Sequence, residues 1–98
     1  MNMAMIKKMQ NDMMKAQAEI EASIFVGKAS GEAVQIEING KKEVSKVTID
    51  PSIVDPEDLS FLEDLVMIAM NDATKQADAK SEATMGKLTG GMKIPGLF

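Results

Sequence analysis

Apolar positions near the N-terminus follow a helical period. Ile6, Met9, Met13, Ala16 and Ile20 are spaced alternately three and four residues apart, which is typical of a narrow apolar seam along one face of a helix. The pattern predicts a helix over residues 3–21, about 28 Å long at 1.5 Å per residue. Methionine is flexible and polarisable, so this seam suits a core or a subunit interface.

The periodicity changes to that of β-strands after Ser23. Residues 24–26 form a short β-prone run, and the segment from Gly27 to Gly31 predicts a break behind it. Residues 34–38 then alternate apolar and polar side chains, and residues 44–49 form a further β-prone run. The middle of the chain is therefore expected to form three strands.

A hairpin is expected between the last two runs. Asn39-Gly40 is a dipeptide preferred in type I′ turns, because both central residues of that turn have positive φ. Pairing across this turn places one set of apolar side chains on a common face of the sheet: Val34, Ile36, Ile38, Val47 and Ile49. A small sheet with one apolar face needs helices to cover it, so the fold class is predicted to be α+β with an antiparallel sheet.

A second helix is predicted behind the sheet. Asp55 is expected to be its N-cap and Pro56 its first residue, with Glu57 and Asp58 in the first turn. N-capping explains these carboxylates better than a metal site does, and no metal or cofactor is expected. The same three-four spacing recurs at Leu59, Leu62, Val66, Ala69 and Ala73.

The far end of the second helix is expected to project from the domain. Behind Ala73 it becomes polar, with only alanines on its apolar side. Glycines and a proline interrupt residues 86–98, which predicts a flexible C-terminal tail. Residues 1–85 are thus expected to form a single α-β-β-β-α domain, with residues 86–98 as its tail.

The apolar surface of the two helices predicts a homodimer. Residues 61–70 are apolar on almost every side, and a helix of that kind must be covered on several faces. A second copy of the chain is the usual solution. The residues expected at the dimer interface are Ile6, Met9, Met13, Leu62, Val66, Met67 and Met70.

Composition argues against an enzyme. The 98 residues include no histidine, cysteine, tryptophan, tyrosine or arginine, which removes the commonest general base and nucleophile. The formal net charge is −4, but residues 1–46 carry +1 and residues 47–98 carry −5. No apolar run approaches the roughly 20 residues of a spanning helix, so a cytoplasmic location is expected.

Several phrases along the chain resemble the YbaB/EbfC family of nucleoid-associated proteins. They are VQIEINGKKEV from Val34, VTIDPS from Val47, LEDLV from Leu62, NDA from Asn71, and MGKLTGG from Met85 with a closing PGLF. Each phrase is weak alone, but their order and spacing together are specific. The resemblance implies a tweezer-like homodimer whose projecting helices grip double-stranded DNA in the nucleoid.

Carried over by position, the resemblance assigns DNA contacts to lysines on both helices: Lys7, Lys8, Lys15, Lys75 and Lys80. Without arginine, bidentate reading of guanine is unavailable, so binding is expected to rest on lysine–phosphate contacts with little sequence specificity. The alternative is a dimeric interaction scaffold whose main ligand is a recombination or repair protein. Genes of this family often neighbour genes of recombination mediators, which makes such a mediator the candidate partner.

Overall fold

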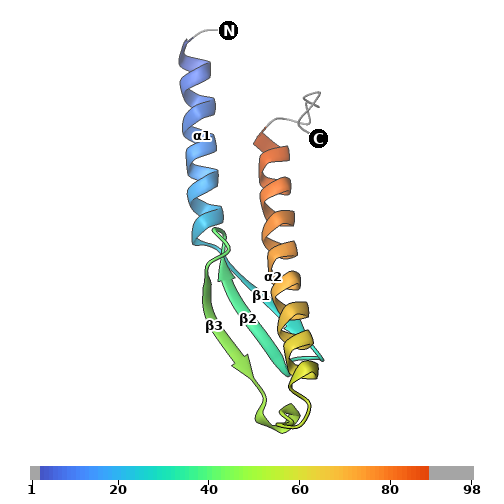
Figure 1. The fold of residues 1–98 in the computed structure, drawn as a ribbon. Coiled ribbons are helices and arrows are strands. Elements are labelled where there is room, and N and C mark those ends of the chain that lie inside the picture. The colour runs from blue at the N-terminus through green and yellow to red at the C-terminus, as the bar shows by residue number, and fades with distance from the viewer. Residues whose placement is uncertain (1–2, 89–98) are drawn as a thin grey trace.

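The protein folds into a helix, a three-stranded antiparallel sheet and a long second helix (Figure 1). The computed structural model describes residues 3–88, and the strands lie in the order β1-β2-β3. The elements are α1 (Met3–Ala22), β1 (Ile24–Ala29), β2 (Val34–Asn39), β3 (Val44–Ile49), the 3-10 helix η1 (Pro51–Ile53) and α2 (Leu59–Leu88). The predicted α+β class and order of elements are confirmed.

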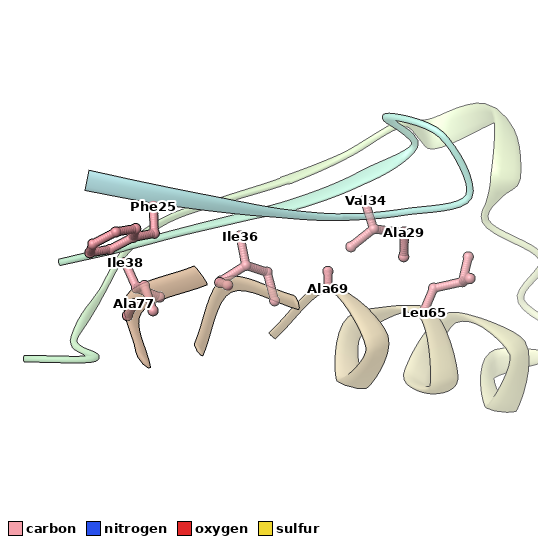
Figure 2. Close-up of a cluster of buried hydrophobic side chains, with 9 residues drawn as sticks. Phe25, Ala29, Val34, Ile36, Ile38, Leu65, Ala69 and Ala77 are labelled. Atoms are coloured by element: carbon pink, nitrogen blue, oxygen red, sulfur yellow. The ribbon is translucent and has the colours of Figure 1, made fainter. Parts of the chain in front are cut away.

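The core lies between the sheet and the first half of α2 (Figure 2). Apolar side chains of β1 and β2, including Phe25, Ile36 and Ile38, point toward α2. From α2, Leu65 and an alanine stripe at residues 69, 73 and 77 face the strands, each spaced by four residues. Small side chains on α2 allow its backbone to lie very close to the sheet.

β1 is longer than the sequence pattern predicts. A break was expected at residues 27–31, but the strand continues to Ala29. Gly27 faces α2, and a Cβ atom there would collide with the backbone carbonyl oxygen of Ala69. This glycine therefore permits a close helix–sheet contact within the strand, and the prediction that it ends the strand was wrong.

The β2–β3 hairpin has a different turn from the predicted type I′. Neither Asn39 nor Gly40 has positive φ, whereas Lys42 has φ of 65°. The Lys42 N–H donates to the carbonyl of Asn39 at 3.0 Å, and the Asn39 N–H donates to the carbonyl of Glu43 at 3.1 Å. This is a three-residue loop in which a turn is followed by a left-handed residue. The predicted common face is nevertheless confirmed, since Val34 pairs with Ile49 and Ile36 with Val47.

Asn39 and Gly40 stabilise this hairpin through a side-chain acceptor and a close contact, and not through the predicted positive φ angles. The Asn39 Oδ1 accepts hydrogen bonds from the backbone N–H groups of Lys41 (2.9 Å) and Glu43 (3.0 Å). A Cβ at Gly40 would collide with the carbonyl oxygen of Ile20, at the end of α1. The dipeptide thus fixes the loop conformation and lets the loop contact α1 closely.

The start of α2 also differs from the prediction. Asp55 caps only a local turn, in which its Oδ1 accepts the Glu57 N–H at 2.9 Å, and the helix begins at Leu59. Asp50 is the N-cap of η1, and its pKa lies below the ordinary value because the Ser52 N–H and hydroxyl donate to its carboxylate. At its other end α2 continues through Gly86 to Leu88, beyond the predicted boundary at Met85. Residues 89–98 of the predicted tail lie outside the described residues.

Candidate nucleic-acid interface

Two helical segments extend side by side beyond the hairpin end of the sheet (Figure 1). We call residues 3–16 of α1 and 79–88 of α2 the helical arms. They run in opposite directions, and the part of the chain that the structure describes measures 65 × 25 × 16 Å along its principal axes. Met9 and Met13 of α1 lie with Met85 and Leu88 of α2 around a cavity of about 50 Å³. These apolar side chains therefore lie between the two arms.

The five lysines predicted to contact DNA are all exposed. Lys7, Lys8 and Lys15 lie on α1, with Lys75 and Lys80 on α2. No carboxylate of residues 3–88 forms an ion pair with any of the five. The ion pairs found in that range are Lys28–Glu32 and Lys42–Asp78, the second of which joins the hairpin loop to α2 at 2.8 Å. The predicted lysines therefore have charges that no ion pair within residues 3–88 neutralises.

The fold brings Lys15 close to a lysine that sequence reasoning missed. Lys15 and Lys87 line the same shallow groove between the arms, together with Asp12 and Glu19. Lys87 lies seven residues after Lys80, a spacing that returns to the same side of a helix. That spacing could have identified Lys87 from the sequence, but Lys87 falls in the segment predicted to be a tail. Lys8 and Lys15 have the same seven-residue spacing on α1.

Lys75 lies apart from this group. It lines a hollow on α2 with Asp72 and Asp78 and the polar side chains of Asn71 and Thr74. At about 100° per residue, Lys75 is on the opposite side of α2 from Leu88, which contacts α1. The structure therefore separates Lys75 from the arm lysines and places it beside carboxylates.

Charge is distributed unevenly along the molecule. The arms carry five lysines and two carboxylates, whereas residues 50–64 carry six carboxylates and no lysine. Residues 50–64 include η1 and the start of α2, which lie at the end of the molecule opposite the arms (Figure 1). A molecule with net charge −4 thus presents a positive end, which is the end suited to a polyanion.

The residues predicted at a dimer interface occupy two regions. Ile6, Met9 and Met13 lie on α1, where they are 39%, 47% and 48% exposed. Leu62, Val66 and Met70 are half-buried against the core, and Met67 is exposed. On β3, Val44 and Val47 are also exposed, although their register partners Ile38 and Ile36 are buried.

The structure defines a small two-layer α+β protein with lysine-bearing helical arms at one end. The sequence profile of the YbaB/EbfC DNA-binding family matches residues 1–92, and the chain belongs to that family. A nucleoid-associated protein of Clostridium novyi is 46% identical over 96 residues, covering 98% of this chain and 84% of the relative. One of Chloroflexus aurantiacus is 45% identical and is covered over 94% of its length.

The fold has also been seen in a solved structure. The crystal structure of an uncharacterized Helicobacter pylori protein matches 92% of this chain and 99% of its own, with a TM-score of 0.76 and 21% identity. The family and the curated relatives are named as DNA-binding, nucleoid-associated proteins and not as enzymes, which confirms the prediction that this protein is not an enzyme. Within residues 3–88, no helix has the length and apolar character to cross a membrane.

Proposed function

We propose that this protein is a nucleoid protein that binds double-stranded DNA as a homodimer, with little sequence specificity, through lysines on the helical arms. Membership of a DNA-binding family and the nucleoid-associated relatives support DNA as the ligand. The observation that carries the proposal is the set of exposed, unpaired lysines on the arms, at the end of the molecule remote from the acidic segment 50–64.

The arm lysines suit the phosphate backbone better than the bases. Lysine is a flexible point charge, and the bidentate guanine contact of arginine is not available to this chain. Binding therefore depends on neutralising phosphates and releasing counterions. Lys7, Lys8, Lys15, Lys80 and Lys87 are the proposed contacts, and Lys75 is expected to contribute least because it lies outside the arms, on another side of α2.

A homodimer explains the apolar surface that the single chain leaves uncovered. Within residues 3–88, α2 packs on β1 and β2, and Val44 and Val47 on the apolar face of β3 remain half exposed. Beside it, α2 carries the exposed Leu59 and Met67, each more than half exposed. A second copy covering this surface would remove these side chains from water and double the number of arm lysines.

On this proposed surface, the predicted interface residues of α2 and those of α1 are expected to contribute unequally to the dimer. Val66, Met67 and Met70 of α2 stay at its centre. Met9 and Met13 already face the small cavity between the arms, which Met85 and Leu88 of the same chain also line. We therefore expect these two α1 residues to contribute less to the dimer than the α2 residues do.

The test is a salt series of DNA affinity for a charge-neutralised variant. In a dimer, replacing Lys8, Lys15 and Lys87 by Gln removes six positive charges from the arms. Each lost phosphate contact reduces the slope of log K against log salt by about 0.9, so the slope should fall by up to about 5. Fluorescence anisotropy with a labelled random duplex measures both affinity and slope.

The matched control replaces three lysines of the sheet and its loops by Gln: Lys28, Lys41 and Lys46. It makes the same change in net charge but leaves the arms intact, and the exposed Lys28–Glu32 pair that it breaks contributes little. The control should bind DNA with nearly the original slope. Equal losses in both variants would show that total charge, and not the arms, determines binding.

A protein ligand is the alternative function, favoured by the exposed methionines of α1. Met3, Met5 and Met14 are 73%, 56% and 70% exposed, and methionine-rich surfaces adapt to varied partners. The alternative predicts one stoichiometric protein partner, such as a recombination mediator, together with no affinity for duplex DNA at low salt. Affinity pull-down combined with the anisotropy measurement separates the two functions.

A further inference from the structure

The two outer edges of the sheet differ in their hydrogen bonding. On β1, the backbone N–H of Lys28 donates to Asp72 Oδ2 at 3.0 Å, and the carbonyl of Val26 accepts from Gln76 Nε2 at 2.8 Å. Both partners come from α2, one helical turn apart. Polar side chains of α2 thus occupy the backbone groups through which another strand would pair with β1.

The outer edge of β3 has no such cover. The Asp50 N–H donates to the Ala33 carbonyl at 2.8 Å, which directs the backbone of residue 50 toward β2. Because backbone groups alternate direction along an antiparallel strand, Thr48 and Lys46 also face β2, while Val47 and Ile49 face outward. Within residues 3–88, no side chain hydrogen-bonds to the outward groups of Val47 and Ile49. This edge is open.

We infer that β3 of one homodimer pairs edge to edge, antiparallel, with β3 of a second homodimer, and that this pairing bridges two DNA duplexes. The inference rests on the proposed DNA binding by the arms. The arms extend beyond the hairpin end of the sheet (Figure 1), and antiparallel pairing turns the hairpin ends of the two sheets in opposite directions. The two sets of arms therefore point away from each other and reach separate duplexes.

A second copy of this chain fits the edge by its own symmetry. The β2–β3 register shifts between Glu37 and Ile38, which leaves Ser45 as a bulged residue and residues 46–49 as the regular part of the edge. A two-fold axis centred on Val47 places that residue opposite its counterpart, with Lys46 opposite the partner's Thr48. No like charges are directly opposed, and Lys46 is beside Glu37 of its own sheet in the β2–β3 register. The inward-facing valines of the two strands become neighbours on one apolar face.

The size of the edge determines when pairing occurs. The four regular residues span about 13 Å, and with a sheet about 10 Å thick the contact covers roughly 130 Å² per subunit. Stable interfaces bury about 800 Å² per partner. The β3 edges thus pair weakly in free solution and pair effectively when DNA-bound subunits are held at high local concentration.

Substitution of Val47 by proline tests the pairing directly. Proline removes the outward N–H and is tolerated on an edge strand where that N–H does not face the neighbouring strand. Across the two-fold axis the pair loses two hydrogen bonds, so capture of a second labelled duplex by an immobilised duplex should fall about tenfold or more. Affinity for a single short duplex should match that of Val47→Ala, because both variants remove most of the valine side chain from the proposed dimer surface.

The control is Val47→Ala, which shortens the same side chain but keeps the N–H, and at equal affinity for a single duplex it should bridge about tenfold or more better than Val47→Pro. Bridging by Val47→Pro at the original level would overturn the inference, as would a wild-type protein that binds one duplex and never captures a second.

In the bridged complex, hydrogen exchange at the Val47 and Ile49 amides should be slow. Fast exchange there would overturn the pairing even if Val47→Pro fails to fold. Loss of all DNA affinity in the wild type would instead refute the proposed function.

Discussion

Replacement of Gly27 by alanine tests the contact that positions α2 and, through it, the arms. The added Cβ would collide with the Ala69 carbonyl oxygen and lie 2.5 Å from the Ala73 nitrogen and 2.8 Å from the Ala73 Cβ. Ordinary contact distances are about 3.5–4.0 Å, so α2 must move away from the sheet by roughly an ångström. The obstructing atoms are mostly helix backbone, which no side-chain rotation can displace.

The free energy of unfolding should decrease by about 2 kcal/mol or more. Overpacking costs about 1–3 kcal/mol, and the rigid backbone places this site at the upper end. Alanine recovers about 0.5–1 kcal/mol because glycine loses more conformational freedom on folding. If Gly27 were an ordinary strand position without the contact to α2, alanine would stabilise the protein. The sign of the change in unfolding free energy therefore shows whether the close contact exists.

Urea denaturation followed by circular dichroism provides the measurement, at one fixed protein concentration because dimerisation contributes to stability. With a urea dependence of about 1–3 kcal/mol per molar, the midpoint should fall by roughly 1–2 M. Gly86→Ala is the matched control: Gly86 lies inside α2, and a Cβ there meets nothing within 4 Å. That control should gain about 1 kcal/mol. A Gly27→Ala protein as stable as the wild type would refute the close contact.

Two further substitutions test the dimer and the hairpin. Met67→Glu should convert the dimer to a folded monomer, since it buries a charge without a partner, whereas Ile68→Glu, beside the polar hollow of Asp72 and Lys75, should remain dimeric. Light scattering distinguishes these masses, and a dimeric Met67→Glu protein would exclude the proposed surface. Asn39→Ala loses two backbone bonds to Oδ1 and should cost about 1–2 kcal/mol in the same urea assay. Asn39→Asp in a Glu43→Gln background keeps the acceptor without opposing two carboxylates, since the Asn39 Nδ2 donates to Glu43 Oε1 at 2.8 Å. A loss as large as that of alanine would then show that the turn does not depend on Oδ1.

The sequence by itself determined the elements and their order. A three-four apolar spacing defines each helix, and strict alternation at residues 34–38 defines the central strand and its buried face. These signals lie within a few residues of one another and need no knowledge of distant contacts. The five exposed lysines were also available from their positions on predicted helices, and the phrases around the hairpin and the second helix were sufficient to indicate the family.

Only the tertiary structure decided how distant segments meet. Gly27 appears in the sequence as a strand break, but it is a contact point for α2, more than 40 residues away. Lys15 and Lys87 share a groove because the two arms pack together, and Asp72 and Gln76 close one edge of the sheet while the other stays open. Local periodicity specifies which face of an element is apolar. The close packing of helix on sheet determines which residues are brought together, and short-range patterns carry no record of those long-range contacts.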